Sequence, residues 1–299
     1  MKNNKTVICI PSYGFRYVEL FDALKEITEY DIKIFISNDD DRINDYKSLG
    51  IDIINTSAKN IAEKRKFIVD WTIENNYDYA FIIEDDVKSY GYKITSETKR
   101  PTSKTYKRIR VPIKEAIDVL YNRTIEYNAT FSSLIRNAFL GFSHPGNVKV
   151  NKSLNCGQFI CYNVNDIKNN NISIYTDVLF PEDVKFCMDI LMKGLTCICV
   201  ADYTYIENSS NKSVIFSDTI DRSMIHILFA KMYNCPLTID AQGIIRPVIK
   251  FNKYFNIDKL PPYKKNVEDK YRTLFNMFDA GESYENLLNY LKTEILKKN

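Results

Sequence analysis

The sequence is poor in the residues that mark specialised classes of protein. Its 299 residues include only 9 glycines, 9 prolines, 2 histidines and 1 tryptophan, which excludes a collagen-like or low-complexity chain. No stretch approaches the roughly 20 apolar residues of a membrane span. The five N-terminal residues are followed by only five uncharged ones before Pro11, too few for a secretion signal. We therefore expect a cytoplasmic protein with no membrane partner.

Several sequence signatures are also missing. The 41 basic and 38 acidic residues leave a net charge of only +3, so composition alone does not indicate a polyanionic partner. The 7 cysteines include no C-x-x-C pair and lie mostly in apolar runs, which predicts buried, reduced thiols. A phosphate-binding P-loop, a G-x-G-x-x-G turn and a Ser-His-Asp order are absent, so NTPase, dehydrogenase and hydrolase activities lack their motifs.

The first ninety residues alternate between short apolar runs and helical patterns. Strands are expected at 7–10, 32–36, 51–54 and 79–83, and helices at 18–28 and 60–74. Such alternation predicts an α/β fold with a mostly parallel sheet covered by helices on both faces. Ligands of these sheets bind beyond the carboxyl ends of the strands. Those ends carry Pro11–Arg16, Asp39–Asp41 and Glu84–Asp86.

The rest of the chain gives weaker patterns. Between Lys88 and Arg110 there are eight basic residues and one acid, and we expect a mobile, irregular basic segment. Further helices are expected at 115–121 and 180–192, strands at 159–162, 196–200 and 203–206, and mainly helices after 217. This predicts a sheet domain over residues 1–215 and a helical extension packed on it over 216–299.

The strongest chemical feature is the acidic triplet Glu84-Asp85-Asp86, directly after the apolar run that ends at Ile83. Adjacent carboxylates at the end of a buried strand repel one another. A hard divalent cation resolves this conflict, because carboxylates and diphosphate oxygens form the usual shell of Mg²⁺ or Mn²⁺. The alternative is a solvated acidic loop after an edge strand.

The position of this triplet at the end of the fourth strand resembles the DxD motif of GT-A glycosyltransferases, here Glu84-x-Asp86. The resemblance implies a hexosyl- or pentosyltransferase of GT-A-like fold that uses Mn²⁺ or Mg²⁺. Asp86 and Glu84 would bind the metal, with Asp86 as the leading ligand, and Glu84 would also lie near the ribose. The helix pattern beginning Glu182-Asp183 also matches that family, with Gly194 twelve positions after the glutamate. Asp183 would be the catalytic base, with Glu182 beside it, although favourable interaction with the helix dipole alone also explains acids there.

Within that group, the segment from Asn60 to Ile68 together with the acidic triplet is similar to the TET-associated glycosyltransferases of phages and eukaryotes, which are thought to glycosylate hydroxymethylated pyrimidines such as hydroxymethylcytosine in DNA. This implies a UDP-sugar donor, a DNA acceptor and, for a phage-encoded chain, a location in the host cytoplasm. The residues expected on the nucleotide-sugar side are Pro11, Ser12, Tyr13, Arg16, Asp39, Lys64, Arg65, Glu84 and Asp85.

The acceptor side would use the basic segment and two later loops. The expected contacts are Lys99, Arg100, Lys104, Lys107, Arg108, Arg110, His144, Asn155 and Gln158. Basic residues interleaved with tyrosines suit phosphate contact and base stacking, although a solvated surface loop has the same composition. Two other functions stay open: transfer to a protein or glycan, and a non-catalytic DNA-binding module. His226 lies in an apolar helical pattern, which favours a core histidine over a third metal ligand.

Overall fold

The computed structural model describes residues 4–15, 18–87, 90–96, 106–136, 148–151, 158–174, 182–205, 219–239, 244–257 and 265–295. These divide into two compact units, one with the described residues up to 205 and one with those from 219 on. We describe each unit by itself.

Within the described ranges of the first unit, ten strands form one sheet in the order β3-β2-β1-β4-β9-β7-β10-β5-β6, with β8 pairing to β10. Their bounds are β1 Thr6–Ser12, β2 Asp31–Ser37, β3 Asp52–Thr56, β4 Tyr79–Ile83, β5 Tyr90–Ser96, β6 Tyr106–Pro112, β7 Phe131–Arg136, β8 Val148–Val150, β9 Phe159–Asn163 and β10 Cys197–Tyr205. The first four strands run parallel. Beyond β4 the sheet is mixed, since β9 is antiparallel to both β4 and β7, and β7 is parallel to β10.

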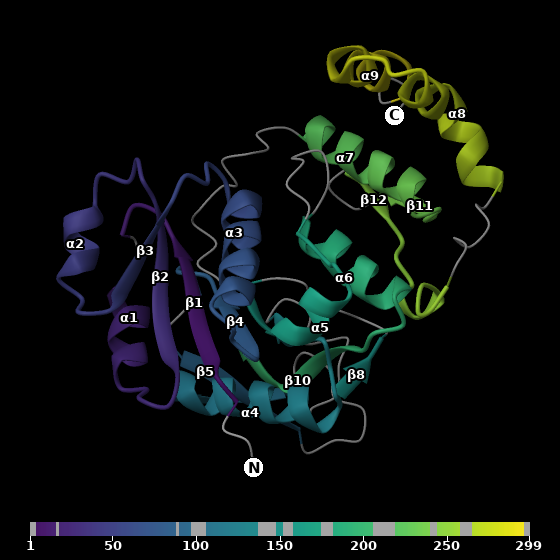
Figure 1. Cartoon of the computed structure of the whole chain (residues 1–299). Coiled ribbons are helices and arrows are strands. Elements are labelled where there is room, and N and C mark those ends of the chain that lie inside the picture. The colour runs from purple at the N-terminus through teal and green to yellow at the C-terminus, as the bar shows by residue number, and fades with distance from the viewer. Residues whose placement is uncertain are drawn as a thin grey trace. The chain divides into compact units, whose positions relative to one another are not determined.

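Helices cover both faces of this sheet (Figure 1). They are α1 Val18–Lys25, α2 Ile43–Lys47, α3 Ile61–Glu74, α4 Ile113–Glu126, α5 Val164–Asn169 and α6 Glu182–Met192. Alternate residues of a strand point to opposite faces. Ile34 and Ile36 of β2 accordingly share one core with residues of α1 and α4, whereas the Phe35 ring between them packs against Trp71 of α3.

The α/β fold expected from the sequence is confirmed, and the first ninety residues follow the predicted order of elements closely. Asn60 caps α3 by accepting a hydrogen bond from the Glu63 amide. Burial is confirmed for the six cysteines that the structure describes: Cys9, Cys161, Cys187, Cys197, Cys199 and Cys235.

Two expectations differ from the structure, and some elements were not expected. Residues 90–96 and 106–112 of the basic segment form the antiparallel pair β5–β6, not an irregular excursion. Because β6 is the last strand of the sheet order, its charged side chains suit an edge, and such an edge lacks apolar periodicity. The two strands expected around Val200 and Tyr203 are one strand, β10, with a bulge between Val200 and Thr204. Helices α2 and α5 and strands β7 and β8 were not expected.

The second unit contains three α-helices in its described residues: α7 Thr219–Met232, α8 Lys265–Asp279 and α9 Tyr284–Tyr290. A small hairpin, β11 Leu237–Ile239 with β12 Ile245–Pro247, accompanies two short turns of helix, η2 Phe251–Lys253 and η3 Leu291–Ile295. His226 Nδ1 lies 2.8 Å from the Ile245 carbonyl oxygen, a structural contact within this unit. In the part of the chain that the structure describes, the helices are too short or too polar to cross a bilayer.

Candidate active site

The candidate site lies at the carboxyl ends of three parallel strands. Strands β1, β2 and β4 are neighbours with the same direction, so the segments that follow Ser12, Ser37 and Ile83 meet at one edge. Helix α3 adds Lys64 and Arg65, both of which are buried. A buried cation requires anionic or hydrogen-bonding partners, and both residues find them at this edge.

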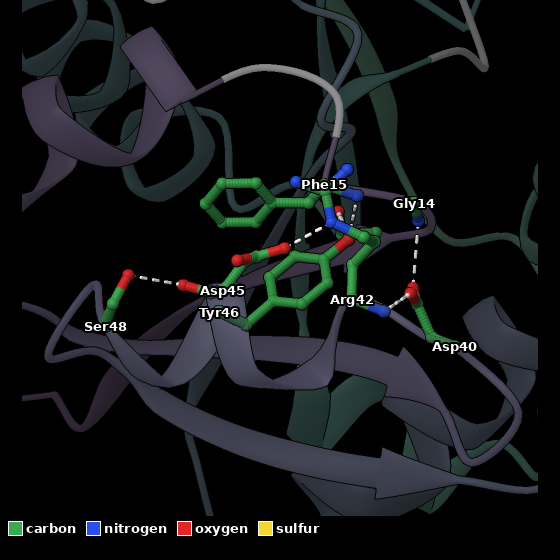
Figure 2. A network of polar contacts seen from close by, with 8 residues as sticks. Gly14, Phe15, Asp40, Arg42, Asp45, Tyr46 and Ser48 are labelled. Carbon is green, nitrogen blue, oxygen red and sulfur yellow. Dashed lines mark hydrogen bonds and ion pairs between the residues drawn. The ribbon is translucent and has the colours of Figure 1, made fainter.

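The loop after β1 is held in a strained conformation. Phe15 has a φ of +51°, a left-handed value that is uncommon for a bulky residue. Its amide donates a hydrogen bond to the Tyr46 hydroxyl at 2.7 Å, and the Gly14 amide donates to Asp40 Oδ2 at 2.9 Å. The Phe15 and Tyr46 rings meet edge to face with centroids 4.9 Å apart, as Figure 2 shows. Strain of this kind persists only where neighbours fix it, so α2 and the end of β2 shape this loop.

Lys64 and Asp85 fix the other side of the same loop. Lys64 Nζ donates to the Ser12 carbonyl oxygen at 2.7 Å, and Ser12 Oγ donates to Asp85 Oδ2 at 2.5 Å. Burial lowers the pKa of Lys64, while Asp85 and Asp40 act in the opposite direction. Tyr13 is 52% exposed, but its amide donates to Asp85 Oδ2 at 3.4 Å and Lys64 Nζ lies 5.9 Å from the centroid of its ring.

Arg65 joins the end of β4 to the start of α6. Its Nη2 pairs with Glu84, and its Nη1 donates to Glu182 Oε1 at 2.6 Å. Burial opposes the charge on Arg65, yet the two glutamates raise its pKa above the ordinary value. A buried arginine with two carboxylates is a rigid link, and it places Asp183 next to the acidic triplet.

Asp86 has one oxygen engaged and one without a partner. Gln158 Nε2 donates to Asp86 Oδ2 at 3.1 Å, whereas Asp86 Oδ1 is buried and makes no hydrogen bond in the described structure. Burial and then the neighbouring Glu84 and Asp85 raise the pKa of Asp86 to about 7. A buried carboxylate oxygen without a partner is costly, and a hard divalent cation would satisfy it. Asp86 therefore fits the predicted metal.

The remaining carboxylates do not complete a cation site by themselves. Among the described residues, no group of three or more His, Cys, Asp or Glu side chains is arranged to hold a metal ion. Glu84 is already paired with Arg65, and Asp85 accepts from Ser12. Diphosphate oxygens of a bound nucleotide, or water, would be suitable further ligands.

Asp183 is the second carboxylate with altered acidity. It lies in the first turn of α6, where its side chain accepts a hydrogen bond from the Val184 amide. Burial and the adjacent Glu182 raise its pKa, and Arg65 opposes that rise. Lys185 and Asp189, later in α6, form an ion pair with each other at 2.5 Å.

The structure brings most of the residues predicted at the strand ends together. Ser12, Lys64, Arg65, Glu182, Gln158 and the acidic triplet form one chain of contacts. Pro11 is buried within β1, and Asp39 is exposed beyond β2. The side chain of Arg110 is exposed on β6, and for Lys107 and Arg108 the structure describes only the strand. Arg16, Lys99, Arg100, Lys104, His144 and Asn155 lie outside the described residues.

Sequence reasoning missed Tyr46 and the role of Asp40. Tyr46 is fully buried in the short helix α2 and lies in no recognisable motif. Asp40 accepts from both the Gly14 and Arg42 amides. The acidic run 39–41 was a usable signal, but it could not show which of its members turns inward.

Comparisons with known proteins were made at the levels of sequence and structure. No protein-family model matches the chain, and no curated protein matches it. The mannosyltransferase PcManGT from Pyrobaculum calidifontis, solved with GDP-Man and Mn²⁺, is similar in structure over 77% of this chain, with a TM-score of 0.52 and 11% identity. The chain spans 64% of the length of that protein.

TarS residues 1–349 from S. aureus, solved with UDP-GlcNAc, is similar over 98% of this chain and 77% of its own length, with a TM-score of 0.52 and 13% identity. At 11% and 13% sequence identity, structural similarity shows the fold alone. The chain therefore has a GT-A-like α/β fold, with the candidate site at the carboxyl edge of its parallel strands.

Proposed function

We propose that this protein is a metal-dependent glycosyltransferase that takes a sugar from a nucleotide-sugar donor, with UDP as the nucleotide. One observation carries the proposal: Asp86, directly after β4, has a buried oxygen without a hydrogen-bond partner. In support, Arg65 pairs with Glu84 at the same strand end and with Glu182 of α6, the helix that contains Asp183. The similar structures that hold GDP-Man with Mn²⁺ and UDP-GlcNAc support a nucleotide-sugar at such a site.

The residues divide the reaction between two sides of the site. The loop after β1, held by Lys64 and Tyr46, would receive the nucleotide. Asp86 would hold Mn²⁺ or Mg²⁺, which neutralises the negative charge that develops on the departing diphosphate. Asp183 would accept the proton of the acceptor hydroxyl. The hydroxyl oxygen would form the new bond to the anomeric carbon while the bond from that carbon to the diphosphate breaks. A raised pKa makes Asp183 a stronger proton acceptor, provided that it starts ionised.

The acceptor that we propose is a hydroxymethylated pyrimidine in DNA. Its support is the sequence resemblance together with the edge hairpin β5–β6, whose strands include Lys93, Lys107, Arg108 and Arg110. Basic residues at a sheet edge suit phosphate contact. A protein or glycan acceptor would use the same nucleotide-sugar side but would need no salt-sensitive affinity for DNA.

The test is mass spectrometry of nucleosides after the protein is incubated with UDP- and GDP-sugars, Mn²⁺, and DNA with or without hydroxymethylcytosine. We expect sugar addition only to the modified DNA, and none with Asp86→Asn. Turnover of a nucleotide-sugar without transfer to any DNA would support the proposed use of a nucleotide-sugar and reject DNA as the acceptor. If no nucleotide-sugar is consumed under any condition, the proposed activity is wrong.

A further inference from the structure

Gln158, which the sequence assigns to the acceptor side, lies beside Asp86. It immediately precedes β9, the antiparallel neighbour of β4. Its carbonyl oxygen accepts from the Glu84 amide at 2.9 Å, and its own amide donates to the buried Tyr205 hydroxyl at 3.3 Å. Two main-chain hydrogen bonds thus fix Gln158 at the point where β4 gives way to the acidic triplet.

The side chain of Gln158 uses this fixed position to hold Asp86. Its Nε2 donates to Asp86 Oδ2 at 3.1 Å, so that oxygen is already engaged. Asp86 Oδ1 remains buried without a partner, and so does Gln158 Oε1. A hydrogen bond to one carboxylate oxygen fixes the rotation of the carboxylate and therefore the direction in which the other oxygen points.

We propose that Gln158 is a positioning residue for the cation: it fixes Asp86 through Oδ2 so that Oδ1 is presented to Mn²⁺ or Mg²⁺. This inference rests on the proposed function, because it assumes that Asp86 binds a metal. Removing an outer partner of this kind typically costs about 10- to 100-fold in metal affinity. The role requires a hydrogen-bond donor at position 158, and a carboxylate there cannot supply one when ionised.

The experiment measures Mn²⁺ affinity, not turnover. Mn²⁺ is titrated into the full chain with saturating UDP, and free Mn²⁺ is followed by electron paramagnetic resonance. The variants are Gln158→Leu, Gln158→Glu and Asp86→Asn. The matched control is Asn165→Leu, because Asn165 Nδ2 donates to Asp78 Oδ1 at the same 3.1 Å on an exposed part of the same unit.

We expect both Gln158 variants to bind Mn²⁺ about 10- to 100-fold more weakly, and the Asn165 variant to bind like the wild type. The glutamate variant has nearly the same shape and keeps both main-chain hydrogen bonds, so it guards against a folding defect in the leucine variant. Thermal melting without Mn²⁺ checks that each variant folds.

Three results would overturn the inference. Wild-type Mn²⁺ affinity in both Gln158 variants would show that Gln158 does not contribute to metal binding. Tighter binding in Gln158→Glu would make position 158 a direct ligand and not a positioning residue. Either result leaves the proposed function intact if Asp86→Asn still loses Mn²⁺. Failure of the wild-type protein to bind Mn²⁺ with UDP would instead reject the metal dependence of the proposed function and this inference with it.

Discussion

Arg65 Nη1 donates to Glu182 Oε1 at 2.6 Å, which joins two residues that are 117 positions apart in the chain. The Arg65 side chain is only 8% exposed and also pairs with Glu84. This link connects the acidic triplet at the end of β4 to the helix that carries Asp183. Arg65 is the cation that pairs with both Glu84 and Glu182.

Replacing Arg65 with Leu should lower the free energy of unfolding by about 3–5 kcal/mol, because it leaves Glu84 and Glu182, only 13% and 16% exposed, without their cation. Urea unfolding followed by circular dichroism measures this change. The control is Arg123→Leu. Its closer partner Glu126 is 55% exposed and its second partner, Asp202, lies 3.6 Å away, so its loss should cost about 0–1 kcal/mol. Equal stability of the two variants would show that the Arg65 link does not hold the site together.

Asp86→Asn should stabilise the metal-free protein at pH 8 but not at pH 4. In the folded protein the pKa of Asp86 is about 7, compared with an ordinary value of 3.8. Between these values the folded state holds more protons than the unfolded state, so wild-type stability falls as the pH rises through this window. Asparagine cannot ionise and avoids the loss.

The gain at pH 8 should amount to a few kcal/mol, since one pKa unit corresponds to about 1.4 kcal/mol. Thermal and urea unfolding at both pH values, in a buffer with EDTA, measure it. A pH-independent difference between the two proteins would mean that Asp86 is not held in an unfavourable, buried environment.

Asp183→Asn should reduce kcat by about 10²–10⁴-fold, the usual contribution of a general base. The KM for the nucleotide-sugar should change little, because Asp183 is assigned to the acceptor side. Steady-state kinetics on the donor that proves active separate these effects. Asp189→Asn, later in α6, is the control and should retain most of the activity. A large rise in KM with unchanged kcat would move Asp183 to the nucleotide side.

Tyr46→Phe should raise the KM for the nucleotide-sugar several-fold and lower the free energy of unfolding by about 1–3 kcal/mol. The substitution leaves the Phe15 amide without its acceptor, and an unsatisfied buried group carries that cost. Tyr77→Phe also removes a phenolic oxygen, one that donates to Asp31 away from the loop. An equal rise in KM in both variants would mean that Tyr46 does not act through the loop.

Much of this site was predictable because its residues follow strands whose apolar runs are continuous. The apolar run that ends at Ile83 is buried on both faces of the sheet. The first acid after it, Glu84, therefore indicates where the strand ends. The Asn60 cap and the acids at the start of α6 likewise follow local rules for helix ends.

The missed parts depend on tertiary contacts that leave no local pattern. Gln158 reaches Asp86 only because β9 runs antiparallel to β4, a pairing with no signal in either strand. The charges of β6 hide its strand character, since an edge strand needs no second buried face. Tyr46 belongs to a helix of five residues, too short to give a helical periodicity.

The proposed site binds a nucleoside diphosphate through a metal held by Asp86. Isothermal titration calorimetry of UDP with and without Mn²⁺ tests it most directly, in the wild type and in Asp86→Asn. We predict that Mn²⁺ strengthens UDP binding to the wild type at least tenfold and that Asp86→Asn abolishes this gain. Equal UDP affinity with and without Mn²⁺, or an undiminished Mn²⁺ effect in Asp86→Asn, would contradict the claim.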